Sequence, residues 1–187
     1  MSLITIVETK DIISIISDGQ GTDSEGNSVM TGFQKFYTAD DYFVAVGNSE
    51  VVARLLFSDF REKNADKTYV EKLLKEQASL INKEYGLIFC DLTTDEPQYT
   101  LFNHFNQIFE TRNFTSKEIN NLPIFIHSGH LDEVSIGLTK YKISQMVLAD
   151  QSNDEIIEVQ KNFHQFAANT DQTVNDELFH HIFHKKK

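Results

Sequence analysis

The chain has 187 residues, of which 40% are hydrophobic and 24% are charged. This balance is typical of a globular protein with a substantial core. The formal net charge of −11 removes the phosphate attraction that drives nucleic-acid binding and would repel an anionic membrane. We therefore expect neither nucleic acid nor a membrane as a partner.

The cysteine content points to a reducing compartment. Cys90 is the only cysteine and lies in the apolar run Gly-Leu-Ile-Phe-Cys, so no internal disulfide is possible and burial is its expected fate. The chain shows no signal peptide and no run approaching the ~20 apolar residues of a membrane helix. A cytoplasmic location is the resulting expectation.

The first part of the chain predicts two β-hairpins. Residues 4–9 and 12–17 are rich in Ile, Val and Thr and flank a Lys10-Asp11 turn. A polar loop follows, and residues 33–47 predict two more short strands. Folding the first hairpin about its turn places the start of the chain near the end of the second strand.

The hydrophobic period then changes to that of a helix. Apolar residues at helical spacing predict amphipathic helices over 49–63 and 67–84. Ser49 is suited to cap the first of these through its hydroxyl.

The remaining chain predicts further strands and two more helices. Extended segments are expected at 86–93, 98–105, 107–112 and 122–128. Helices are expected at 131–148 and 152–168, the second with a Ser152 and Glu155 capping box, and a last strand at 177–184. This order predicts an α+β protein in which helices cover both faces of a mainly antiparallel sheet. No linker or repeat interrupts it, so residues 1–187 are interpreted as one domain.

Three stretches carry a resemblance to a known family. They are Thr5-Ile6-Val7, the loop from Asp18-Gly19-Gln20 through Thr22, Asn27-Ser28-Val29-Met30 and Gly32 to Lys35, and the strand-to-helix junction from Val44 to Glu50. In this order and spacing they resemble the proteasome-like N-terminal nucleophile (Ntn) hydrolases, most closely the bacterial proteasome-like peptidase that works with a ring ATPase. The match is good over about residues 4–60, and only the element order and Ser128-Gly129 extend it.

The resemblance implies a four-layer αββα sandwich and threonine-type peptide hydrolysis. Such enzymes use a residue-one hydroxyl or thiol as nucleophile and the terminal amine as base. By resemblance, Asp18 and Lys35 take the acidic and lysine positions that set protonation. Gly47 falls in the oxyanion loop, and Ser128 is the serine that assists the amine.

The nucleophile has two alternative assignments. Removal of Met1 would expose Ser2, which the hairpin places near Asp18 because Leu3 then lies opposite that aspartate. Alignment on Thr5-Ile6-Val7 instead puts Ile4, which has no hydroxyl, at the nucleophile position. Residues 1–3 also resemble a short extension left by cloning. A non-catalytic assembly or binding protein with the same fold is therefore an alternative function.

Each site residue also has a plain structural interpretation. Asp18 could simply end a strand, Lys35 could be an exposed strand lysine, Gly47 could mark a strand end, and Ser128 could belong to a turn. A further alternative is an unrelated α+β module that resembles the family by chance.

No metal or other cofactor is expected. The loop that starts at Asp18 fails the EF-hand pattern because its sixth and twelfth positions are Asp23 and Val29, which leaves only a cation bound by some other geometry. His180 and His184 would share one side of a strand, whereas His181 would face the other, so three zinc ligands do not converge.

The expected partners follow from the resemblance. The chain should associate with itself into a homo-oligomer or ring and act on a peptide substrate, and an ATPase partner is left open.

Overall fold

The computed structural model describes residues 3–22, 27–77, 84–127 and 130–185. The chain divides into two compact units. The first comprises residues 1–34 and 116–187, and the second comprises residues 35–115. Each unit has its own antiparallel sheet and its own pair of helices. The single domain expected from the sequence stays a prediction.

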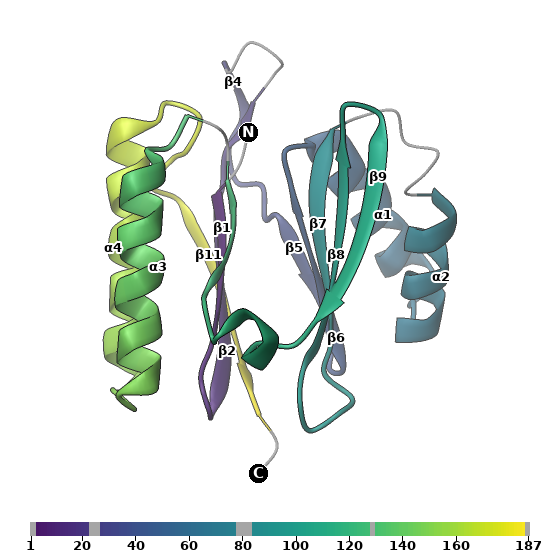
Figure 1. Cartoon of the computed structure of the whole chain (residues 1–187). Coiled ribbons are helices and arrows are strands. Elements are labelled where there is room, and N and C mark those ends of the chain that lie inside the picture. Colours follow the sequence, from purple (N-terminus) through teal and green to yellow (C-terminus); the bar gives the residue numbers. More distant parts are fainter. Residues whose placement is uncertain (1–2, 23–26, 78–83, 128–129, 186–187) are drawn as a thin grey trace. The chain divides into compact units, whose positions relative to one another are not determined.

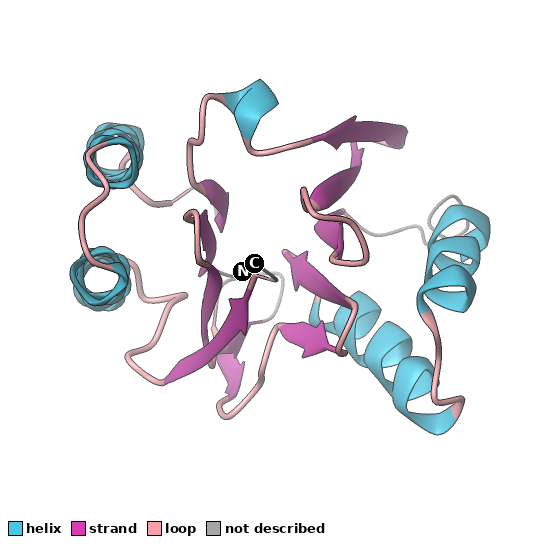
Figure 2. Cartoon of the chain, turned by 90° about the horizontal axis from the view of Figure 1, so that it is seen from below, coloured by secondary structure: helices cyan, strands magenta, loops and turns pink. Residues whose placement is uncertain are grey.

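The first unit is a four-stranded sheet with two helices on one face. Its strands, in spatial order, are β10 (Ile124–His127), β1 (Leu3–Glu8), β2 (Ile12–Asp18) and β11 (Leu178–His184). The helices are α3 (Glu133–Leu148) and α4 (Asn153–Thr170), which lie side by side against the sheet in both Figure 1 and Figure 2. Two short strands, β3 (Gly21–Thr22) and β4 (Ser28–Met30), and a 3₁₀ turn at Lys117–Ile119 complete the unit.

Strand β1 and helices α3 and α4 share a hydrophobic core. It contains Leu3 and Val7 of β1, Ile136 and Ile143 of α3 and Phe163 of α4, among other buried residues. The capping box predicted for α4 is present: the Ser152 side chain accepts from the Glu155 amide, and the Glu155 carboxylate bonds back to Ser152. Capping and burial together explain why 153–170 forms a regular helix.

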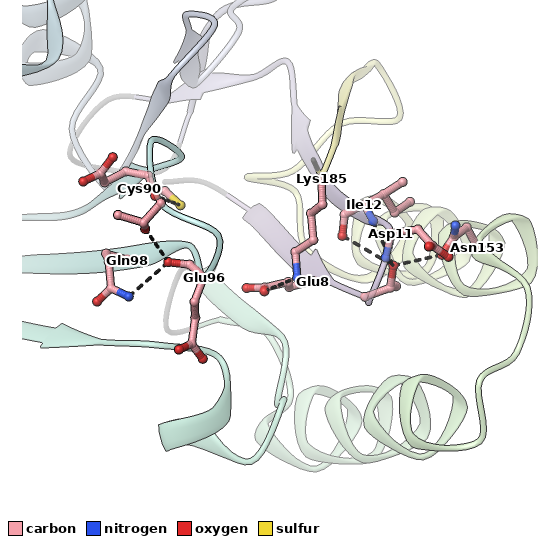
Figure 3. Close-up of polar contacts among 11 residues, drawn as sticks. Glu8, Asp11, Ile12, Cys90, Glu96, Gln98, Asn153 and Lys185 are labelled. Carbon is pink, nitrogen blue, oxygen red and sulfur yellow. Dashed lines mark hydrogen bonds and ion pairs between the residues drawn. The ribbon is translucent and has the colours of Figure 1, made fainter. Parts of the chain in front are cut away.

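The predicted opening hairpin is confirmed. Strands β1 and β2 pair from Ile4–Ser17 to Glu8–Ile13, and the turn between them closes through the bond from the Thr9 amide to the Ile12 carbonyl. At this turn end, the ion pair between Lys185 and Glu8 ties the chain just after β11 to β1 (Figure 3). The other end of the β1–β2 hairpin, which we call the opening ribbon, carries the candidate site.

The second unit is a five-stranded antiparallel sheet with two helices. The strands, in spatial order, are β5 (Phe36–Thr38), β6 (Tyr42–Gly47), β7 (Tyr85–Asp91), β8 (Gln98–Phe105) and β9 (Ile108–Phe114). Helices α1 (Glu50–Glu62) and α2 (Lys67–Gln77) lie on one side of this sheet in Figure 2. Ser49 caps α1 as predicted, and Cys90 is a buried free thiol within β7.

Among the described residues, no helix combines the length and the apolar character needed to span a bilayer.

Candidate active site

The candidate site begins where the opening ribbon ends, at Asp18. The Leu3 amide donates to Asp18 Oδ1 over 2.8 Å, and the Gln20 amide donates to Asp18 Oδ2 over 3.1 Å. Leu3 and Asp18 both have 0% exposure. The predicted placement of Leu3 opposite Asp18 is thus confirmed, one step beyond the Ile4–Ser17 pair. Asp18 does end its strand, but it is a fully buried carboxylate that accepts two backbone hydrogen bonds rather than an ordinary turn residue.

The loop after Asp18 is bonded to the segment between α4 and β11. The Gly19 amide donates to Asn175 Oδ1 over 2.9 Å, and the Gln20 side chain donates to the Gln172 carbonyl over 2.7 Å. These bonds join residues more than 150 positions apart in the chain. The C-terminal segment therefore helps to position the Asp18 loop.

Glu177 completes this support. Its carboxylate accepts from the Gly32 amide over 2.8 Å, and Gly32 has φ +73, a conformation that favours glycine. A Cβ at Gly19 would lie 2.8 Å from Glu177 Oε2 and 3.1 Å from the Phe179 ring. An alanine at 19 would therefore have to displace the Glu177 carboxylate and crowd the Phe179 ring. Sequence reasoning missed Glu177 and Asn175 because nothing in their local pattern connects them with a loop so distant in the chain.

Lys35 and Gly47 come together in the second unit. Phe36 of β5 pairs with Ala45 of β6, and the Val46 amide donates to the Lys35 carbonyl over 2.9 Å. Lys35 therefore lies across from Val46, beside Gly47. The interpretation of Lys35 as an exposed strand lysine is wrong: it precedes β5 and is only 2% exposed. Because an ammonium group is rarely buried without compensating interactions, this burial distinguishes Lys35 from an ordinary surface lysine.

The junction after Gly47 also has the predicted form. Strand β6 ends at Gly47, Asn48 adopts a left-handed conformation with φ 67, and Ser49 caps α1. The chain turns sharply here because Asn tolerates positive φ better than most residues.

Thr5 is committed to a buried polar network inside the first unit. Its hydroxyl lies 2.9 Å from His164 Nε2 and 2.8 Å from Gln160 Nε2. Gln160 also receives the Ser14 hydroxyl on its side-chain oxygen at 2.8 Å. Thr5, Gln160 and His164 are all fully buried. The structural role of Thr5 is therefore to join β1 to α4, and its hydroxyl is directed into the protein.

Two of the predicted site residues, Ser2 and Ser128, lie outside the described residues. In the described part of the chain, no group of three or more His, Cys, Asp or Glu side chains is arranged to hold a metal ion. In β11, His180 pairs with Ile16 and His181 with Ile15. The side chains of these two neighbouring histidines therefore point to opposite faces of the sheet.

Comparisons with known proteins identify the fold. The chain has the α+β fold of the proteasome-like Ntn hydrolases. A solved structure with this fold is the eukaryotic HslV from Trypanosoma brucei, which matches with a TM-score of 0.63 and 16% sequence identity over 97% of this chain and 99% of that chain. No family model matches the sequence. A search of curated proteins likewise finds no significant match. The likeness extends over nearly the whole chain and is not confined to its N-terminal part.

Proposed function

We propose that the chain is a proteasome-type subunit that hydrolyses peptide bonds with an N-terminal nucleophile. The nucleophile is Ser2, exposed as the terminal residue when Met1 is removed. Asp18, Lys35, Gly47 and Ser128 supply the surrounding chemistry. The fold supports the class of protein, and the site supports the reaction.

The observation that carries this proposal is the bond from the Leu3 amide to Asp18. It fixes Leu3 beside a buried carboxylate at the open end of the ribbon. A residue joined to Leu3 has its Cα about 3.8 Å from that of Leu3. A terminal serine at position 2 would thus have its hydroxyl and its amine within reach of the Asp18 region.

The proposed reaction is acyl transfer to the serine hydroxyl. The terminal amine takes the hydroxyl proton while Oγ attacks the amide carbonyl, and a backbone N–H at the Gly47 loop stabilises the oxyanion. The C–N bond then breaks, and the leaving amine receives the proton. Water hydrolyses the resulting ester and restores the hydroxyl. By resemblance, the positive charge of Lys35 favours the neutral form of the amine, Asp18 fixes the strand end beside it, and Ser128 assists the amine.

Assembly and location are part of the same proposal. We infer that copies of the chain associate into a ring, as the proteasome-like fold suggests, and that the protein works in the cytoplasm on peptide substrates.

The reaction is tested with untagged protein and short fluorogenic peptides. Ser2→Ala is expected to lower the hydrolysis rate to background, and Lys35→Met is expected to lower it at least a hundredfold. Ser58→Ala, which removes an exposed serine hydroxyl from α1, is the matched control and should leave the rate unchanged. Equal rates in wild type and Ser2→Ala would refute Ser2 as nucleophile.

The second candidate function is a non-catalytic assembly or binding protein. It is supported by the Thr5 network, since Thr5 has its hydroxyl bonded to Gln160 and His164 and Ile4 offers no hydroxyl. If the mature chain starts at Ile4 or Thr5, no free nucleophile remains at the ribbon end. Mass spectrometry of the native N-terminus separates the two functions, because only the enzyme requires a terminal serine.

A further inference from the structure

The C-terminal strand β11 is an edge strand that is linked to the candidate site. Among the described strands, it pairs along its length with β2 alone. Asn175, just before the strand, accepts a hydrogen bond from the Gly19 amide. Glu177 accepts one from the Gly32 amide. Because a ladder of hydrogen bonds holds β11 on one side only, its release would leave the other strand pairs intact and would withdraw both acceptors from the loop after Asp18.

His180 lies within β11 and is bonded to the neighbouring strand. Its Nε2 atom lies 3.0 Å from the Ser14 hydroxyl oxygen of β2. The Ser14 hydroxyl donates to the side-chain oxygen of Gln160 on α4 over 2.8 Å. Because a hydroxyl has a single proton, the bond between His180 and Ser14 must be donated by the histidine ring. The neutral ring therefore carries its proton on Nε2, and acidification would have to add a second proton at Nδ1.

The orientation of Gln160 supports this assignment. Its side-chain nitrogen donates to the Thr5 carbonyl over 2.9 Å and to the Thr5 hydroxyl over 2.8 Å. Since a carbonyl oxygen only accepts, this end of the amide is the nitrogen and the opposite end is the oxygen that faces Ser14. Thr5, Ser14 and Gln160 are all buried. A buried and satisfied network thus fixes the tautomer of His180.

The surroundings of His180 oppose a second proton on the ring. Burial lowers the pKa of His180, and the charges of Lys161 on α4 and His181 on β11 act in the same direction. Burial also lowers the pKa of His181, which points to the opposite face of the sheet. Both histidines of the strand therefore resist protonation while β11 is docked.

The other groups packed against β11 do not offset these effects. Ser14 and Ile16, the residues of β2 that bond to and pair with His180, carry no charge. His164, the other titratable group that α4 directs into the network, lies beside the Thr5 hydroxyl. Asp18 lies at the end of β2, where its carboxylate accepts from backbone amides. The docked strand thus lacks a counter-charge for a protonated His180 in the described part of the chain.

The sign of the pH dependence follows from the lowered pKa. In a released strand the ring would have its ordinary pKa of about 6.5. Because the docked ring has a lower pKa, the released strand binds more protons at acidic pH. Docking is therefore fully favourable above about pH 6.5 and weakens as the pH falls toward the lower value of the docked ring.

We propose that residues 175–184 form an acid-sensitive strap, which separates from β2 when His180 is protonated and thereby frees the loop after Asp18. At neutral pH the strap is docked, and Asn175 and Glu177 hold the loop. In acid the loop loses both acceptors. Control of peptide hydrolysis by the strap rests on the proposed function, whereas the release of the strap does not.

The test is amide hydrogen exchange of the untagged protein at pH 7.5 and pH 5.5, corrected for the intrinsic effect of pH on exchange. Protection of segments 17–22 and 178–184 should fall at least about tenfold at the lower pH. Strands β6 and β7 of the second unit should keep their protection. Equal protection of the strap at both pH values would overturn the proposal, as would a parallel loss in β6 and β7, which would indicate global unfolding.

Substitution of His180 assigns the effect to one group. His180→Gln keeps an N–H that can donate to Ser14 but has no group that titrates in this range, so its strap should remain protected at pH 5.5. His184→Gln, at an exposed histidine of the same strand, is the matched control and should lose protection like wild type. An unchanged acid loss in His180→Gln would overturn the proposal. If this variant does not fold at pH 7.5, the wild-type comparison between the strap and β6 and β7 still decides.

Peptide hydrolysis at the same two pH values separates the strap from the proposed function. The rate of His180→Gln relative to wild type should rise at least about fivefold between pH 7.5 and pH 5.5. An active enzyme whose strap stays protected would overturn the strap alone. A chain that releases its strap in acid but cleaves no peptide at either pH would support the strap and contradict the catalytic proposal.

Discussion

Replacement of Asp18 should reveal how strongly the candidate site is tied to folding. Asp18→Ala removes the acceptor of two backbone hydrogen bonds, from Leu3 and from Gln20. Bonds to a charged acceptor contribute about 1.5–3 kcal/mol each, and the buried amides would be left unsatisfied. The free energy of unfolding should therefore fall by about 3–6 kcal/mol, a large part of the 5–15 kcal/mol typical of a folded protein.

Asp18→Asn is the matched comparison. Its amide oxygen can still accept from Leu3, whereas its NH₂ group cannot accept from Gln20. We expect a loss of about 1–3 kcal/mol, measured by urea unfolding with the slope of the transition checked against wild type. If Asp18→Ala unfolds within 1 kcal/mol of wild type, the two bonds do not hold the ribbon end. Loss of activity in Asp18→Ala has to be interpreted together with this measurement, which makes Asp18→Asn the better variant for kinetics.

Three further predictions concern other contacts. Gly19→Ala should lower the free energy of unfolding by about 1–3 kcal/mol, because the added methyl group approaches Glu177 closely. In a double-mutant cycle with Glu177→Ala, the loss in the double variant should be smaller than the sum of the single losses by at least ~0.5 kcal/mol. Additive losses would contradict the packing argument. Burial opposes the ionisation of Asp91, but hydrogen bonds from Lys67 and a neighbouring threonine outweigh it and lower the Asp91 pKa. The stabilisation is present above the unfolded pKa of about 4 and is lost as the pH falls through the lower folded value, so the destabilisation by Lys67→Met should shrink on acidification; a pH-independent difference would refute the pair. Gln160→Leu should cost about 2–4 kcal/mol in chemical unfolding because it leaves buried polar groups unpaired, and a neutral effect would show that the network contributes little.

Much of the fold could be predicted because local patterns and tertiary structure agree. The Ile- and Val-rich hairpin, the Ser49 cap and the capping box at Ser152 each have local signals, and all are present. Helix α3 was expected from its helical spacing. The same spacing did not reveal that Val134, Leu138, Tyr141 and Leu148 are exposed, because periodicity identifies an apolar face without showing what covers it.

The candidate site was less accessible to sequence reasoning. The hairpin register placed Leu3 opposite Asp18 because side chains and backbone partners alternate regularly along paired strands. The burial of Lys35 was not predicted, since a lysine between polar and aromatic residues has no local feature that distinguishes a buried position from an exposed one. The contacts from Asn175 and Glu177 depend on the docking of a distant segment, which single-sequence patterns do not encode.

The most direct test of the account is to identify the nucleophile with a peptide electrophile that reacts with hydroxyl groups. The treated protein is digested with trypsin and analysed by mass spectrometry. We predict one adduct per chain, located in the peptide of residues 2–10 and absent from Ser2→Ala. A native chain that retains Met1, or an adduct confined to another peptide, would contradict catalysis by a terminal serine.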